Sequence, residues 1–120
     1  MAKKDELGRA GERRAEEHLR SLGWQVLDRN WRCAEGEIDL VAADAGALVV
    51  VEVKTRSGEG FGHPFEAVDA RKRRRLWRLA MAWVAAHPAA VQGRRVRVDA
   101  VALTGPDPAT ARIEHLEDVA

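Results

Sequence analysis

The spacing of apolar residues predicts regular elements along most of this chain. Between about Asp5 and Leu22, apolar and small residues recur at three- and four-residue spacing with charges between them, which is typical of an amphipathic helix. Gly23 follows in the position of a C-terminal helix cap. Three stretches rich in β-branched residues come next, and they predict a meander of strands over residues 24–31, 37–43 and 48–55.

The second half of the chain predicts another helix and two further strands. Asp69 is the expected N-cap of a helix that runs through His87 and is stopped by Pro88. Alternating residues predict a strand over 95–103, a turn over 104–108 and a last short strand over 111–116. The order αβββαββ indicates an α/β fold, in which a mixed β-sheet is flanked by helices.

Segment 57–64, between the third strand and the second helix, contains three glycines and a proline, so we expect a loop that is flexible or approaches a ligand. His63 lies in this loop, where it could reach a substrate phosphate, and its role stays open. Trp77 and Trp83 of the second helix fit core or partner contacts better than base stacking.

Length and composition favour one domain spanning residues 1–120, with a core of about 8–104 and a terminal strand or tail over 105–120. The apolar fraction of 46% is too high for a disordered chain, and no apolar run approaches the ~20 residues of a membrane span. The N-terminus lacks the apolar stretch of a secretory signal, so we expect a cytoplasmic protein. The single cysteine, Cys33, predicts neither an internal disulfide nor a zinc site.

The net charge of +1 conceals charges that are sorted along the chain. Residues 57–100 carry nine basic and four acidic side chains, and the start of the second helix is almost wholly basic. Cations are unfavourable at a helix N-terminus, so helix stability does not explain them, although a solvated helix face stays open as an alternative. Arginine suits bidentate contact with phosphate, so we expect nucleic-acid binding by a basic group that comprises Arg56, Arg71, Lys72, Arg74, Arg75 and Arg78.

Charged residues also interrupt two otherwise apolar strands. If the four-residue turn over 44–47 joins them as a hairpin, every opposed pair of residues sums to 91. Asp39 then lies opposite Glu52, and Glu37 lies opposite Lys54, one of only four lysines in the chain. Opposed like charges repel at the ~5 Å that separates such side chains, so two facing carboxylates need compensation.

A divalent cation would compensate those two carboxylates. Mg²⁺, or Mn²⁺ in its place, binds carboxylate oxygens while keeping several waters, and Lys54 could then orient or activate a water for attack on a phosphodiester. Two alternatives stay open at this stage. The charged residues could form an ion-pair ladder on a solvated face, and a one-residue slip in register would separate the carboxylates. For Glu37 we prefer pairing with Lys54 to metal ligation.

The chain resembles the YraN-like family of small bacterial proteins within the PD-(D/E)XK nuclease superfamily. The motifs that carry this resemblance span nearly all of residues 8–100, and their combination is specific. They comprise Gly11-Glu12, Asn30-Trp31-Arg32, Gly36-Glu37-Ile38-Asp39-Leu40-Val41, Val50-Val51-Glu52-Val53-Lys54-Thr55-Arg56, Phe61-Gly62, Glu66-Ala67-Val68, Lys72 and Arg97-Val98-Asp99. Ile38 stands where the superfamily signature has proline, a change that leaves the metal chemistry intact.

The resemblance implies a restriction-endonuclease-like fold, related to archaeal Holliday-junction resolvases, and a Mg²⁺-dependent nuclease activity on DNA, including branched DNA. It implies that Asp39 and Glu52 are metal ligands and that Lys54 is the catalytic lysine. It also implies that Glu12 completes the site, whereas its charged helix alone favours a solvated role.

Two rival functions remain at this stage. One is a non-catalytic nucleic-acid-binding module of the same fold, and the other is a protein-interaction domain. A symmetric junction substrate would suit a homodimer.

Overall fold

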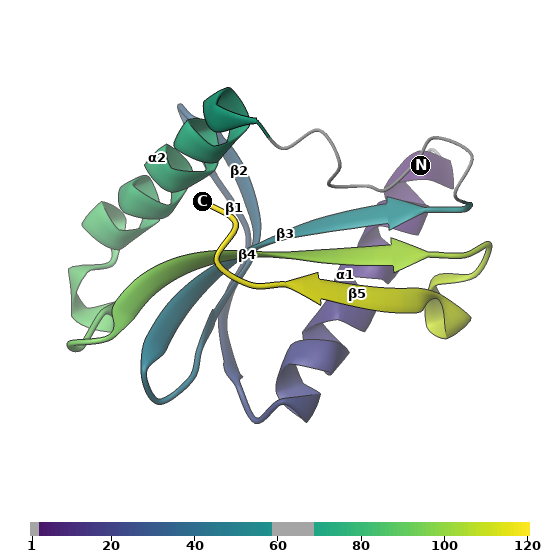
Figure 1. Ribbon diagram of the computed structural model, residues 1–120, viewed down its shortest axis with the longest axis horizontal. Coiled ribbons are helices and arrows are strands. Elements are labelled where there is room, and N and C mark those ends of the chain that lie inside the picture. The colour runs from purple at the N-terminus through teal and green to yellow at the C-terminus, as the bar shows by residue number, and fades with distance from the viewer. Residues whose placement is uncertain (1–2, 59–68) are drawn as a thin grey trace.

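Five strands form one mixed sheet that separates two helices, in a computed structural model that describes residues 3–58 and 69–120 (Figure 1). The order of helices and strands is αβββαββ, as the apolar pattern predicts. Two short 3₁₀ helices, which the pattern did not predict, follow α2 and β4. In chain order the elements are α1 (Lys3–Ser21), β1 (Gln25–Cys33), β2 (Gly36–Ala43), β3 (Ala47–Arg56), α2 (Ala70–Ala86), η1 (Pro88–Ala90), β4 (Arg95–Thr104), η2 (Pro108–Thr110) and β5 (Arg112–Leu116).

The strands lie in the sheet in their chain order, from β1 to β5. Neighbouring strands are antiparallel except β3 and β4, which are parallel. A parallel pair needs a crossover connection, and α2 lies in that crossover. The expected hairpin register is confirmed for four pairs of β2 and β3, from Leu40 opposite Val51 to Ala43 opposite Leu48.

Each face of the sheet buries one helix, because side chains of consecutive strand residues point to opposite faces. Ala15 and Leu19 of α1 pack on Val49 and Val51. The opposite face holds the apolar stripe of α2 together with Leu48 and Val50. That stripe consists of Leu76, Leu79, Ala80 and Trp83, so the expectation that Trp83 belongs to the core is confirmed.

Local caps end the helices where the sequence indicated. Gly23 has a φ of 84°, and its N–H donates to the Arg20 carbonyl at 2.9 Å, which closes α1. The Asp69 side chain accepts from the Lys72 N–H at 2.9 Å and caps α2. A further glycine fixes the approach of α1 to the sheet, since a Cβ at Gly11 would collide with the Thr55 side chain. Glu12 is therefore held beside β3.

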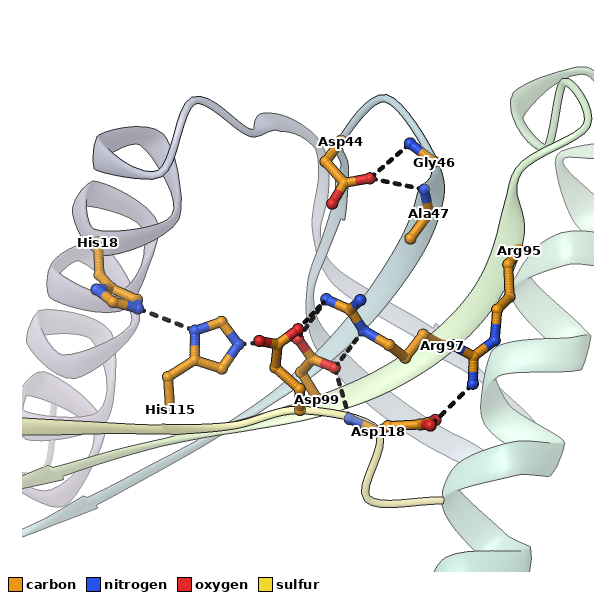
Figure 2. Close-up of polar contacts among 10 residues, drawn as sticks. His18, Asp44, Gly46, Ala47, Arg95, Arg97, Asp99, His115 and Asp118 are labelled. Atoms are coloured by element: carbon orange, nitrogen blue, oxygen red, sulfur yellow. Dashed lines mark hydrogen bonds and ion pairs between the residues drawn. The ribbon is translucent and has the colours of Figure 1, made fainter.

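Asp99 of β4 is the only buried charged residue of the described chain. Its carboxylate accepts hydrogen bonds from Arg97 at 2.9 and 3.1 Å and from the Asp118 N–H at 3.0 Å. His115 Nε2 lies 2.8 Å from the same carboxylate, and His115 Nδ1 lies 3.0 Å from His18 Nε2 (Figure 2). This network ties α1, β4, β5 and the C-terminal segment together.

Three further expectations concern Cys33, membrane-spanning helices and the loop over residues 57–64. Cys33 is half-buried and its thiol is free. None of the helices in the described part of the chain is long and apolar enough to cross a membrane. Most of the expected loop over 57–64, with His63 and the Phe61-Gly62 motif, lies outside the described residues, as does Glu66.

Candidate functional site

Asp39 lies on β2, just before the part of that strand that pairs with β3. The described ladder ends at Leu40 and Val51. Beyond it, Asp39 Oδ2 accepts a hydrogen bond of 2.8 Å from the Val53 N–H. The carboxylate thus accepts a hydrogen bond that a backbone carbonyl of the partner strand would otherwise accept. This hydrogen bond holds the Asp39 side chain at the end of the hairpin ladder.

The surroundings of Asp39 oppose its negative charge. Burial, together with the charges of Glu12, Glu52 and Glu37, raises the pKa of this carboxyl group to about 7. The hydrogen bond from the Val53 N–H acts in the opposite direction and is outweighed. The polar environment of Asp39 is therefore built mainly of other carboxylates, which suits a site that receives a cation.

Glu52 of β3 and Asp39 line one hollow of about 120 Å³ beneath α2, together with Glu37 and Arg75. Glu52 Oε2 is buried and has no hydrogen-bond partner, and the nearest cation is Lys72 Nζ at 3.8 Å. The two carboxylates are therefore brought together as the register predicted, and one of their oxygens is left without a donor.

Glu12 of α1 lies close enough to Asp39 to raise the pKa of that carboxyl group, although it lines a neighbouring hollow. Burial raises the pKa of Glu12 itself, and the charge of Glu37 adds to the shift. A side-chain hydrogen bond with Asn30 and the charge of Arg9 act the other way. The half-buried Glu12 thus belongs to the same group of carboxylates, and a purely solvated role is not supported.

The preferred pairing of Glu37 with Lys54 is wrong. Glu37 forms its ion pair with Arg32 instead, with Arg32 Nε 3.7 Å from Glu37 Oε2. The described ladder ends before these two residues would face each other. Lys54 is exposed at the far end of β3, where strand alternation gives it the same face as Glu52, and it does not line the hollow that holds Asp39.

The six basic residues that are expected to bind nucleic acid lie in different environments. Lys72 and Arg75 reach the carboxylates, as an ion pair with Glu52 and as a wall of the hollow. Arg74 and Arg78 lie on another part of α2, and Arg78 also contacts Glu35 at 3.4 Å. The remaining two members are Arg71, which is exposed, and Arg56, whose Nε is buried without a hydrogen-bond partner.

Within residues 3–58 and 69–120, no three His, Cys, Asp or Glu side chains are grouped closely enough to hold an ion on their own. Zinc sites in proteins generally need three or four such ligands. Magnesium is usually bound by one or two carboxylates, with waters and substrate phosphates completing its shell. Asp39 and Glu52 therefore fit the second kind of ion.

Sequence reasoning did not foresee that Lys72 would lie beside Glu52, or that Asn30 would hydrogen-bond to Glu12. Lys72 carried a usable signal, because it is one of only four lysines in a chain that otherwise uses arginine. Asn30 carried a weaker signal as a polar residue within a predicted strand. Its φ of 52° lies in the left-handed region, which asparagine tolerates better than most residues.

Comparison with known proteins gives a consistent result. The model of a family described as "Uncharacterised protein family UPF0102" matches residues 11–103, a segment that contains Glu12, Asp39, Glu52 and Lys54. A UPF0102 protein of Arthrobacter sp. (strain FB24) is 50% identical over 119 residues, which are 99% of each chain.

Other relatives are equally similar. UPF0102 proteins of Beutenbergia cavernae and Frankia alni are 51% identical over 119 residues and 52% identical over 116 residues. These matches cover 99% of each chain in the first case, and 97% of this chain and 95% of the relative in the second. UPF0102 is the YraN family, so the family expected from the motifs is confirmed.

Proposed function

The chain belongs to the uncharacterised protein family UPF0102, and on that premise we propose that it is a metal-dependent nuclease that hydrolyses phosphodiester bonds in DNA. The observation that carries the proposal is the Asp39 carboxylate. Burial and the charges of Glu12, Glu52 and Glu37 together raise its pKa to about 7. Such an arrangement destabilises the folded protein unless a cation or a proton compensates it.

Asp39 and Glu52 are the residues that would hold the ion. The buried Oε2 of Glu52 has no donor and the nearest protein cation is 3.8 Å away, so the hollow accommodates a further positive charge. A divalent cation bound there would supply Lewis-acid stabilisation of the charge that develops on a phosphate oxygen. Glu12 adds negative potential from α1 and strengthens the attraction for a cation.

The basic residues of α2 would bind the substrate. Arg75 lines the carboxylate hollow, and its guanidinium can contact a phosphate that enters it. Lys72 Nζ lies 3.8 Å from Glu52 Oε2, so it could also contact a phosphate bound beside Glu52. Lys54, exposed and on the same face as Glu52, would orient the attacking water and accept its proton. In these roles the residues of this chain would act as the family resemblance implies.

The direct test is cleavage of flap, nicked, single-stranded and four-way-junction DNA in the presence of Mg²⁺ or Mn²⁺. We expect cleavage by the wild type, abolition by EDTA, and a loss of at least about 100-fold in Asp39→Asn and in Lys54→Ala. Glu17→Gln is the matched control, because Glu17 is an exposed carboxylate of α1 outside the site. Equal rates in all four proteins would refute the proposal.

A non-catalytic nucleic-acid-binding module is the second candidate. The observation that favours it is the exposed position of Lys54, which does not line the hollow of Asp39 and Glu52. A module of this kind would bind DNA in a salt-dependent way through α2 and cleave none of the substrates. Its affinity for DNA would also be the same with and without Mg²⁺.

A further inference from the structure

The outward side of α2 carries a surface that the carboxylate site does not use. Trp77 is 38% exposed there, one of two large hydrophobic side chains that remain exposed in the described chain. Its neighbours line a shallow, open hollow on the surface, to which Ala120 of the C-terminal segment also contributes. We define the Trp77 surface by the helix residues of this hollow, which are Ala70, Arg73, Arg74, Trp77 and Arg78.

We propose that the Trp77 surface binds single-stranded nucleic acid by stacking an unpaired base on the Trp77 indole, while the adjacent arginines contact the flanking phosphates. This inference rests on the proposed nucleic-acid function and names the class of substrate. DNA with an unpaired strand would be bound more tightly than a continuous duplex, whose bases are already stacked on each other.

Helix geometry puts these residues on one patch. Residues three and four positions apart lie on the same side of an α-helix, so Arg73, Arg74 and Trp77 are immediate neighbours. The buried stripe that begins at Leu76 lies on a neighbouring side of α2, so Trp77 flanks it. Trp77 is 38% exposed, whereas Trp83 is 2% exposed. The expected core contact is therefore confirmed for Trp83, while much of the Trp77 indole faces outward.

Charge identifies the partner as an anion. Between residues 70 and 86, α2 contains six cationic side chains and no acidic one. The acid that contacts the Trp77 surface is Glu35, 3.4 Å from Arg78, and both side chains of this pair are about half exposed. Exposed ion pairs of this kind are weak, so a phosphate can replace Glu35 without a large loss.

The isolated aromatic ring favours a nucleic acid over a membrane. Amphipathic helices that enter lipid need a continuous apolar face, whereas the outward side of α2 has one indole among arginines. Aromatic rings beside cations are typical of proteins that bind single strands, because every base offers a π-face and every linkage a negative charge.

Trp77 and the carboxylates lie on different sides of α2. Lys72, which contacts Glu52, precedes Trp77 by five residues, about 7.5 Å along the helix axis and about 140° around it. A strand bound at Trp77 would therefore have to pass around α2 to reach the proposed metal ligands.

The test is fluorescence anisotropy with labelled oligo(dT) of about 12 nucleotides, within the site sizes of single-strand binders, and with a blunt duplex of equal length. EDTA in the buffer prevents cleavage. We expect Trp77→Ala to weaken oligo(dT) binding by about fivefold to 100-fold and duplex binding by less than twofold. Trp77→Phe keeps an aromatic face and should retain most of the affinity. Arg13→Ala, an exposed arginine of α1, is the control for charge.

Several results would overturn the inference. Unchanged oligo(dT) affinity in Trp77→Ala would show that no base stacks there, and an equal loss for duplex would show that Trp77 only shapes the helix. Trp77-dependent binding to phosphatidylglycerol vesicles, with unchanged oligo(dT) binding, would point to a lipid surface instead. If Trp77→Ala fails to fold, loss of oligo(dT)-induced fluorescence quenching in Trp77→Phe supports the inference, and undiminished quenching refutes it.

Failure of the inference and failure of the nuclease proposal are distinguishable. A wild type that cleaves nothing but binds oligo(dT) through Trp77 would refute the nuclease and support base stacking. A protein that cleaves DNA with unchanged single-strand affinity in Trp77→Ala would do the reverse. Oligo(U) in a parallel titration separates RNA from DNA as the source of the strand.

Discussion

Asp39 and Asp99 lie on strands on either side of β3, and they differ in what surrounds them. Burial would raise the pKa of Asp99, but hydrogen bonds from His115, Arg97 and a backbone N–H outweigh burial and lower it. Asp39 has one backbone hydrogen bond, and burial with neighbouring carboxylates raises its pKa to about 7. The fold thus stabilises the negative charge of Asp99 with hydrogen bonds, whereas the charge of Asp39 is left uncompensated.

This difference separates a structural carboxylate, Asp99, from the carboxylate that we propose to be functional, Asp39. A buried charge with a full set of donors holds elements together, as Asp99 does for α1, β4, β5 and the C-terminal segment. A carboxylate among other carboxylates reduces the stability of the folded state. Such a group is typical of sites where a ligand supplies the missing charge. The helix α1 serves both, with His18 toward Asp99 and Glu12 toward Asp39.

The largest expected effect is the loss of protein stability when Asp99 is replaced. Asp99→Ala leaves the Arg97 guanidinium, which is 13% exposed, without its main acceptor. We expect the free energy of unfolding to fall by about 3–5 kcal/mol, measured by urea denaturation at pH 7. Since the pKa of Asp99 is lowered, its contribution is present above about pH 4 and is lost as the pH falls further. A loss below 1 kcal/mol would show that the network is not structural.

A smaller effect is expected where α1 meets β3. Gly11→Ala places a Cβ against the Thr55 side chain, and overpacking of this kind costs about 1–3 kcal/mol. Gly8→Ala is the matched control, since a Cβ there meets nothing within 4 Å and the substitution should stabilise the helix by up to about 1 kcal/mol. Both are read by thermal or urea unfolding. Similar changes in the two variants would contradict the close contact between α1 and β3.

The third expected effect is a change in the pH dependence of stability, at most about 1.4 kcal/mol per pH unit, at Asp39. Between about pH 4 and 7 the folded protein keeps a proton on Asp39 that the unfolded chain has released. Wild-type stability should therefore fall with rising pH relative to Asp39→Asn, by at most about 1.4 kcal/mol per pH unit. Above pH 7 the variant should be the more stable protein, by up to about 4 kcal/mol, since a rise in pKa from 3.8 to about 7 is roughly three units at about 1.4 kcal/mol each.

The measurement is urea unfolding in EDTA at several pH values. Burial also lowers the pKa of His18, so His18 favours stability at higher pH, but it does so equally in both proteins and cancels in the difference. Parallel pH profiles for wild type and Asp39→Asn would contradict the uncompensated environment of Asp39.

The sequence predicts the local parts of this account and misses those that depend on distant contacts. Periodicity, the Asp69 cap and the four-residue turn give the elements and the register of the hairpin up to Leu40 and Val51. Asp39 and Glu52 follow directly and line one hollow, whereas Glu37, two residues farther from the ladder, pairs with Arg32 instead of Lys54, which no local pattern reveals.

Long-range packing decides the rest. The Asp99 network needs His18 and His115, which are 97 residues apart in the chain and come from a helix and a strand. Likewise, the contact of Lys72 with Glu52 and the exposure of Trp77 follow from the rotation of α2 on the sheet. The apolar stripe fixes that rotation only in outline, because it specifies the buried side and not the neighbours of the flanking residues.

The most direct test of the central claim is calorimetric titration of the protein with Mn²⁺, and with Mg²⁺ in competition, without DNA. If Asp39 and Glu52 form the metal site, wild type and Glu17→Gln will bind one ion per chain, and Asp39→Asn and Glu52→Gln will bind none. The same binding in all four proteins, or binding in none of them, would contradict the claim that the fold leaves Asp39 uncompensated in order to hold a metal ion.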